Sequence, residues 1–310
     1  MLDPRTTVAT LTEDHVFLTG RPPMEEFLGL VLGQGQGVAT NVAGEVANEW
    51  RTANDHIREL EARESGWADN APIEPLPASL EPLAQQVLAD PIFQRAFALL
   101  PTKLGMVELD KLVVFQKDIN LEAVRGIQST LPSKLAEEDV FRLCLPADHP
   151  HPPTRGMRIA PNAFAFVSPS TDFRSLDVNL FEGNPIPVAS YSGPVSHLLA
   201  FAVGHGANML QAVHAEGRLV LGNGSHRAYA LREIGIQKVP CVIQEVSRRE
   251  ELPVTGLPIA ANPDTFLKSP RPPLLKDYFD VKLRKVVKLP RKSRQVRIAF
   301  QIETSDIPTL

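Results

Sequence analysis

The clearest alternation of hydrophobic and polar positions lies in the second half of the chain. Residues 219–221 form a short apolar run that predicts a buried strand, and residues 222–224 interrupt it with a glycine-rich turn. From Ser225 onward apolar side chains recur at helical spacing, and Gly235 is typical of a helix end. Residues 239–246 predict a further strand. This stretch therefore predicts the order strand, turn, helix, strand.

The first hundred residues show mainly helical patterns. Residues 23–32 predict a short helix, and residues 38–63 carry apolar side chains at steps of three and four. The Asp90-Pro91 pair is typical of a helix start. The apolar seam of 38–63 leaves two alternatives open, a helix packed on its own domain or a helix that binds a protein partner or a second copy.

The middle of the chain predicts short strands joined by turns. The pattern predicts a helix at residues 121–127, capped by Asn120, and another at 196–203. Strands are expected at 107–115, 141–145, 162–168, 177–181, 186–190, 209–214 and 296–302. The residues between 248 and 273 are rich in proline and poor in periodicity, so an extended arm is expected there.

These elements predict an α+β protein in three parts. Residues 1–104 form a mostly helical N-terminal region, and residues 105–247 form a mixed-sheet domain. Residues 248–310 form a proline-rich, basic extension that ends in a strand.

Composition narrows the class of protein. The chain has 310 residues and a formal net charge of −4, which does not favour general nucleic-acid binding. Two cysteines are too few for a disulfide scaffold and fit a reducing cytosol. The N-terminus lacks the apolar core of a signal peptide, and no run approaches 18 apolar residues. We therefore expect a cytoplasmic protein with no membrane partner.

The glycine-rich turn has the chemistry of an anion site. Glycines allow close approach of a ligand to the backbone, and the amides at a helix N-terminus favour phosphate. A guanidinium can bind phosphate oxygens in two places. The candidate phosphate- or nucleotide-binding residues are Gly222, Asn223, Gly224, Ser225, His226 and Arg227.

The same residues resemble a known superfamily. The run from Gly222 through His226-Arg227 to Ala230, followed by Gly235-Ile236 and Val239-Pro240, is similar to the signature of the ParB N-terminal/sulfiredoxin-like superfamily. The resemblance implies a mixed-sheet fold with a nucleotide phosphate near the turn. It covers about 28 residues well, extends weakly back to about residue 105, and is absent before that.

Two departures limit what the resemblance implies. Ser225 stands where sulfiredoxins carry the catalytic cysteine, and Cys144 and Cys241 lie in apolar runs away from the turn. Sulfinic-acid reduction is therefore not expected, because a hydroxyl does not replace a thiol nucleophile. The turn also differs from the acidic version of the segregation ParBs, and no helix-turn-helix module follows it. Neither a true sulfiredoxin nor a partition ParB is predicted.

A second candidate segment follows the strand predicted at 107–115. In ParB-like proteins this junction carries polar residues that face the nucleotide, which makes Lys117 a candidate for phosphate charge and Asp118 for Mg²⁺ or as a base. With His226, these are the candidate catalytic residues. The alternative is ordinary turn chemistry, in which Asn120 caps the next helix. No metal site made by protein alone is expected.

The C-terminal part is basic. Its candidate residues for nucleic acid or a partner are Lys282, Arg284, Lys285, Lys288, Arg291, Lys292 and Arg294. A solvated basic face is the alternative, and nucleic acid is not favoured.

Taken with the resemblance, these patterns predict a ParB-like nucleotide-binding protein that uses ATP or CTP with Mg²⁺. The expected reaction is phosphoryl transfer to a small acceptor or nucleotide hydrolysis. Such reactions depend mostly on positioning and charge neutralisation, so few special residues are needed. Two alternatives stay open. One is a non-catalytic scaffold that binds a protein partner, and the other is a nucleic-acid-binding protein that uses residues 276–297.

Overall fold

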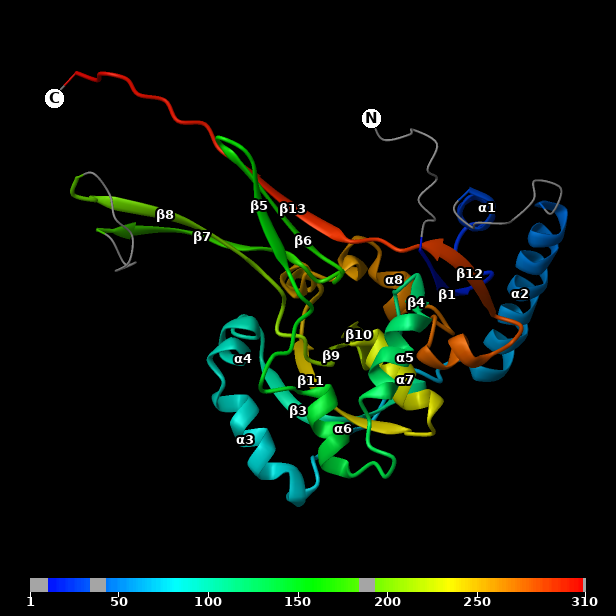
Figure 1. The fold of residues 1–310 in the computed structure, drawn as a ribbon. Coiled ribbons are helices and arrows are strands. Elements are labelled where there is room, and N and C mark those ends of the chain that lie inside the picture. Colours follow the sequence, from blue (N-terminus) through cyan, green and yellow to red (C-terminus); the bar gives the residue numbers. More distant parts are fainter. Residues whose placement is uncertain (1–10, 34–42, 184–192, 309–310) are drawn as a thin grey trace. The chain divides into compact units, whose positions relative to one another are not determined.

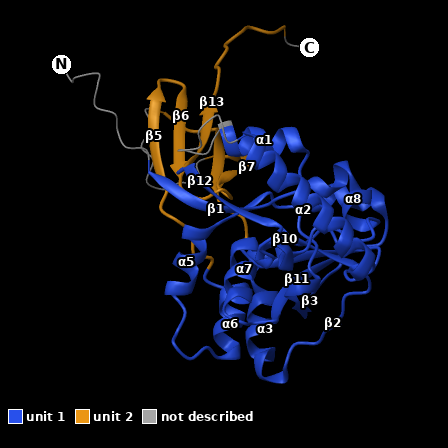
Figure 2. Cartoon of the chain, turned by 90° about the vertical axis from the view of Figure 1, so that its right-hand side faces the viewer, with its two compact units in different colours: residues 1–148, 208–291 blue, residues 149–207, 292–310 orange. Residues whose placement is uncertain are grey.

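A computed structural model describes residues 11–33, 43–183 and 193–308. The chain divides into two compact units, which are coloured separately in Figure 2. The larger unit consists of residues 1–148 and 208–291, and the smaller one of residues 149–207 and 292–310. The smaller unit is thus contributed by two separate stretches of chain, and this division differs from the three consecutive parts expected from the sequence.

A five-stranded mixed sheet forms the centre of the larger unit (Figure 1). Its strands lie in the order β10 (Arg218–Asn223), β9 (Gln211–Ala215), β11 (Lys238–Val246), β3 (Thr102–Glu108) and β2 (Ile73–Glu74). Strands β9 and β11 run parallel, and the other neighbours run antiparallel. The sheet confirms the strands predicted on both sides of the glycine-rich turn, and helices and sheets together confirm the α+β class.

A three-stranded antiparallel sheet completes the larger unit. It has the order β12 (Arg284–Pro290), β1 (Thr12–Leu18) and β4 (Asp118–Asn120). Strand β1 alternates little in polarity at its start, which explains why the sequence pattern did not reveal it. Its end is buried at Val16, Phe17 and Leu18, because it lies between two other strands.

The helices follow the predicted positions in most of the larger unit. They are α1 (Met24–Gly33), α2 (Ala43–Glu64), α3 (Glu81–Ala89), α4 (Pro91–Ala96), α5 (Leu121–Ser129), α6 (Glu137–Cys144), α7 (Ser225–Glu233) and α8 (Pro263–Leu267). The Asp90 carboxylate caps α4 by accepting a 2.8 Å hydrogen bond from the Ile92 N–H, as its sequence predicts.

Helix α2 packs on its own unit. Val46 joins a buried apolar cluster with Phe17 and Phe27, while Ile57 and Leu60 pack with Leu283. Of the two alternatives for this apolar seam, the structure shows packing of the helix on its own domain. The first part of that predicted helix, residues 38–42, lies outside the described residues.

Three sequence predictions in the larger unit are wrong. The strand expected at 107–115 overlaps β3 only at Val107 and Glu108. The strand ends there because Leu109–Lys111 form a 3₁₀ turn. The strand expected at 141–145 lies within α6 instead, since Val140, Phe141 and Cys144 bury one helical face. The proline-rich stretch is no extended arm: Leu252, Ile259, Leu267 and Leu274 are buried in a core cluster.

The smaller unit contains only strands as regular elements among its described residues. One sheet has the order β13 (Arg294–Ala299), β6 (Ala163–Ser168) and β5 (Arg155–Ala160). A separate two-stranded ribbon consists of β7 (Arg174–Glu182) and β8 (His197–Gly204). The helix expected at 196–203 is wrong, because this apolar run pairs along its whole length with β7. The strand expected at 186–190 lies outside the described residues.

Candidate functional site

The glycine-rich turn joins β10 to α7 as the sequence predicts. Gly224 has a φ of +90°, and a Cβ built there would lie 3.0 Å from the Leu210 Cα, so only glycine fits without strain. The Asn223 Oδ1 atom accepts a 2.8 Å hydrogen bond from the Gly224 N–H. Among the described residues no side chain caps the start of α7. Its first turn therefore keeps the partial positive charge of a helix N-terminus.

Arg227 is held by backbone carbonyls beside this turn. Its side chain is only 7% exposed, and its Nη1 atom donates to three backbone carbonyls, those of Leu143 (3.2 Å), Cys144 (3.3 Å) and Asn208 (2.5 Å). Two of these carbonyls belong to the last residues of α6, which lack partners within their own helix. The Arg227 Nη1 atom therefore has a structural role, and charge neutralisation at the turn by Arg227 stays a prediction.

His226 joins the two segments selected from the sequence. Its Nε2 atom accepts a 3.1 Å hydrogen bond from the backbone N–H of Asn120, more than a hundred residues earlier. That bond assigns the imidazole proton to Nδ1. Burial lowers the pKa of His226 below its ordinary value, so the ring is neutral at pH 7. Asn120 also caps α5 by accepting from the N–H groups of Glu122 and Ala123, as predicted.

Asp118 pairs with a histidine that the sequence pattern did not single out. The Nδ1 atom of His15 lies 2.5 Å from the Asp118 Oδ2 atom. The two residues come from adjacent strands β1 and β4, and both keep some exposure. Asp118 and His15 both lie close enough to His226 to influence its pKa, so the three side chains lie near one another. A carboxylate that orients an imidazole is the arrangement of a general base.

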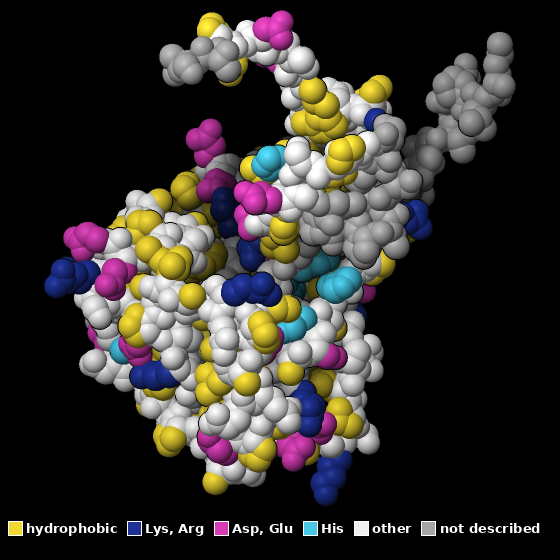
Figure 3. All heavy atoms as spheres, turned by 90° about the vertical axis from the view of Figure 1, so that its left-hand side faces the viewer, with side chains coloured by type: hydrophobic (Ala, Val, Ile, Leu, Met, Phe, Trp, Pro, Cys, Tyr) yellow, Lys and Arg dark blue, Asp and Glu magenta, His cyan; other side chains and the backbone are white. Residues whose placement is uncertain are grey.

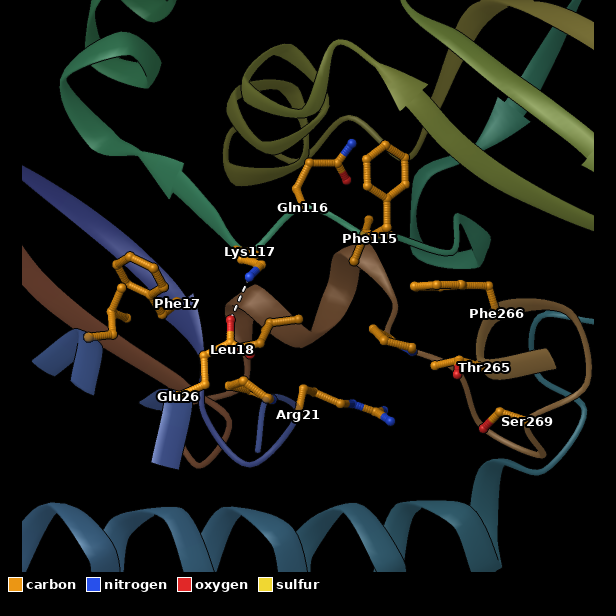
Figure 4. A pocket seen from close by; sticks show the side chains of 14 residues that line it. Phe17, Leu18, Arg21, Glu26, Phe115, Gln116, Lys117, Thr265, Phe266 and Ser269 are labelled. Atoms are coloured by element: carbon orange, nitrogen blue, oxygen red, sulfur yellow. Dashed lines mark hydrogen bonds and ion pairs between the residues drawn. The ribbon is translucent and has the colours of Figure 1, made fainter. Parts of the chain in front are cut away.

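Lys117 lies next to this group on the rim of a pocket. Its exposed Nζ atom is 2.5 Å from the Glu26 Oε1 atom of α1. The pocket encloses about 290 Å³. Figure 4 shows Phe115 and Phe266 on one side of the pocket and the Lys117–Glu26 pair on the other.

The pocket has mostly apolar walls with a few polar groups. The remaining lining residues are Phe17, Leu18, Arg21, Pro22, Leu30, Val114, Gln116, Thr265, Ser269 and Pro273. Two polar atoms of this lining, Arg21 Nε and Gln116 Oε1, are buried and have no hydrogen-bond partner among the described residues. The other amide atom of Gln116 donates to the Leu221 carbonyl at 3.1 Å, directly before the glycine-rich turn. Gln116 therefore contacts both the pocket and the strand residue that precedes the turn.

The basic segment is partly neutralised. Lys285 pairs with Glu49, Lys288 lies 2.9 Å from Asp14, and Arg291 lies 3.1 Å from Glu13. Arg294 donates to the Thr171 carbonyl in the smaller unit. On the face drawn in Figure 3, Lys and Arg side chains occur in separate places among other residues. These pairs favour the alternative of a solvated charged surface over a continuous nucleic-acid interface.

Within the described ranges, no group of three or more His, Cys, Asp or Glu side chains is arranged to hold a metal ion. No described helix is both long enough and apolar enough to cross a bilayer.

Comparisons with family models, curated proteins and solved structures give no significant match for this chain.

Proposed function

We propose that the larger unit is a nucleotide-binding domain of the ParB/sulfiredoxin-like kind that binds phosphate at the β10–α7 turn. The hydrogen bond between Asn120 and His226 carries this proposal, because it brings together the two segments in which the sequence analysis placed the candidate phosphate and catalytic residues. An anion is favoured at the start of α7, since no described side chain occupies the capping position there.

The adjoining pocket supports a nucleotide in preference to a simple phosphate. Phe115 and Phe266 offer aromatic surface for a base. Gln116 Oε1 needs a donor and Arg21 Nε needs an acceptor, and a nucleobase edge carries both. Gln116 also bonds to Leu221, which connects the base pocket with the phosphate turn.

The chemistry would centre on His15. When its Nδ1 atom donates to Asp118, its Nε2 atom carries the lone pair that can take a proton from water or from an acceptor hydroxyl. Asp118 would hold the ring in that tautomer, and Lys117 would add positive charge near the phosphates. Mg²⁺ would neutralise phosphate charge when bound, held by the remaining Asp118 oxygen and by phosphate oxygens. ATP and CTP are the first candidates to test.

Binding is tested by thermal unfolding of the full chain with ATP, CTP, ADP or GTP, each with and without Mg²⁺. A ligand at about a hundred times its dissociation constant should stabilise the fold by about 2.7 kcal/mol. The critical variant is Asn223→Asp, which keeps the acceptor for the Gly224 N–H and adds a negative charge at the turn. It should leave the unliganded protein as stable as before and abolish the nucleotide shift.

A matched control is Asn262→Asp, which makes the same charge change at the exposed start of α8, outside the turn and the pocket. It should leave the nucleotide shift intact. If no nucleotide shifts the unfolding midpoint of the natural chain, or if Asn223→Asp binds as well as the natural chain, the phosphate site is not at this turn.

Measuring nucleotide turnover distinguishes the catalytic proposal from the alternative of a non-catalytic scaffold. His15→Gln and Asp118→Asn should each lower phosphate release about a hundredfold or more if the pair acts as general base. Nucleotide binding with no turnover, tested with small hydroxyl acceptors and with water, would instead favour the non-catalytic alternative.

A further inference from the structure

The smaller unit has too little core to be stable by itself. Among its described residues, the buried hydrophobic side chains are only Ala163, Ala165 and Phe173. Its exposed large hydrophobic side chains are more numerous: Met157, Ile159, Leu176, Val178, Leu180, Phe181, Leu199, Phe201, Ile302 and Ile307. Small folded units need most of their apolar surface covered. This imbalance indicates that part of the unit is covered by something else.

The exposed apolar residues are concentrated on the β7–β8 ribbon. Every residue of β7 is exposed, including Val178 (51%) and Leu180 (70%). In the observed register Val178 faces Phe201 and Leu180 faces Leu199, so these side chains share one face of the ribbon. An isolated two-stranded ribbon is marginal in water, and three or more strands with an apolar face are needed for stability.

The outer edge of β7 has no strand beside it among the described residues. The sequence of β7 is Arg-Ser-Leu-Asp-Val-Asn-Leu-Phe-Glu. When two copies of β7 lie antiparallel with Val178 at the centre, the end residues have opposite charge and two leucines face each other. In that antiparallel register Arg174 lies opposite Glu182 of a second copy. Ser175 lies opposite Phe181, Leu176 opposite Leu180, Asp177 opposite Asn179, and Val178 opposite itself. The pairing of β7 with β8 shifts register between Ser175 and Asp177, so the regular ladder of β7 runs from Asp177 to Glu182.

This register satisfies the rules for neighbouring strands. Opposite charges and apolar pairs across an antiparallel ladder stabilise it, and like charges directly opposite would destabilise it. The register contains two Arg–Glu pairs by symmetry, two Leu–Leu pairs and no opposition of like charges. A two-fold axis is also the usual symmetry of homodimers, in which the same patch is used twice.

We propose that β7 pairs antiparallel with β7 of a second copy of this chain, centred on Val178, to form a four-stranded sheet in the order β8, β7, β7, β8. The second copy is favoured over a foreign partner because Arg174 falls opposite Glu182 and Leu176 opposite Leu180 when β7 meets its own reverse. Pairing would fill the open edge of β7 and double the width of the apolar face. The inference is independent of nucleotide binding.

The first test is a site-specific cross-link of the full chain. Val178→Cys places one thiol beside its own symmetry mate, so mild oxidation should convert most of the protein into a disulfide-linked dimer. Leu199→Cys is the matched control, since Leu199 is similarly exposed on β8. Two β8 strands would lie about 14 Å apart across the sheet, too far for a disulfide. The natural Cys144 and Cys241 are buried and should not interfere.

The second test reverses the charges. Arg174→Glu or Glu182→Arg alone puts like charges opposite each other twice, and each should weaken the dimer about tenfold in sedimentation equilibrium. The double variant Arg174→Glu, Glu182→Arg restores opposite charges and should restore the affinity. A chain that stays monomeric at all concentrations overturns the proposal. So does a dimer that neither single reversal weakens or that cross-links equally through position 199.

Discussion

Arg271 and Asp277 form a two-pronged ion pair in which both side chains are 1% exposed. The Nη1 and Nη2 atoms of Arg271 each donate to a carboxylate oxygen of Asp277 at 2.6 Å. Arg271 also bonds to Glu64 at the end of α2, and Arg21 donates to Asp277. The pair therefore connects the proline-rich stretch with two distant N-terminal segments.

Asp277→Asn should destabilise the larger unit by about 3–5 kcal/mol, because it removes the buried carboxylate of the pair and leaves Arg271 only its partly exposed partner Glu64. Asp110→Asn is the control. It breaks the Arg232–Asp110 pair, whose side chains are about one-third exposed, and should cost at most about 1 kcal/mol. Urea unfolding measures both. Equal small effects would show that the buried pair contributes little.

Arg227→Met should destabilise the fold by about 2–4 kcal/mol, since it removes a donor from the buried carbonyls of Leu143, Cys144 and Asn208. The Cys144 carbonyl keeps its bond from the Leu210 N–H. Arg125→Met on the exposed face of α5 should change stability by less than about 1 kcal/mol. Urea unfolding without nucleotide is the measurement. A stable Arg227→Met protein that only loses nucleotide affinity would contradict the structural role and restore the phosphate role.

The buried imidazole of His226 predicts a pH dependence of stability. Its folded-state pKa lies below the ordinary value of 6.5, so at lower pH the unfolded chain binds a proton that the folded chain does not. The free energy of unfolding should therefore fall as pH drops below about 6.5, by at most about 1.4 kcal/mol per pH unit from this group.

His226→Gln keeps an acceptor for the Asn120 N–H and removes the titration. The variant should lose less stability than the natural chain between pH 7 and pH 5 in urea unfolding. The control is His151→Gln, at an exposed histidine of the smaller unit. It should lose as much stability between pH 7 and pH 5 as the natural chain does. An unaltered pH slope in His226→Gln would mean that His226 is not the responsible group.

Both cysteines should be unreactive in the folded chain. Burial raises the pKa of Cys144 to about 12 and raises the pKa of Cys241 as well, so little thiolate exists at pH 8. Iodoacetamide should label neither thiol natively and both in urea. Native labelling at the rate of free cysteine would show that the core opens readily.

Local sequence patterns predicted the elements whose causes are local. The strand, turn, helix and strand around Gly224 follow from glycine positions and apolar spacing, and Asn120 and Asp90 cap their helices as expected. Short apolar runs did not distinguish a helix from a strand. The runs at 141–145 and 196–203 fit either period, and only packing against β11 or pairing with β7 decides between helix and strand.

The candidate site was predictable only in part for the same reason. Asp118 and His226 were selected from the sequence, but His15 belongs to a strand whose register with β4 is fixed by long-range pairing. The sequence also did not reveal that the Arg227 guanidinium bonds to the carbonyls at the end of α6, because that contact depends on long-range packing.

The pairing of β1 with β12 has a consequence for synthesis on the ribosome. Leu18 pairs with Arg284, so β1 emerges about 270 residues before its partner. At a translation rate of about 5–20 residues per second, β12 is synthesised roughly 15–50 s after Val16, Phe17 and Leu18 of β1. During that interval the edge of β1 that later pairs with β12 has no strand beside it, so it is exposed to incorrect pairing.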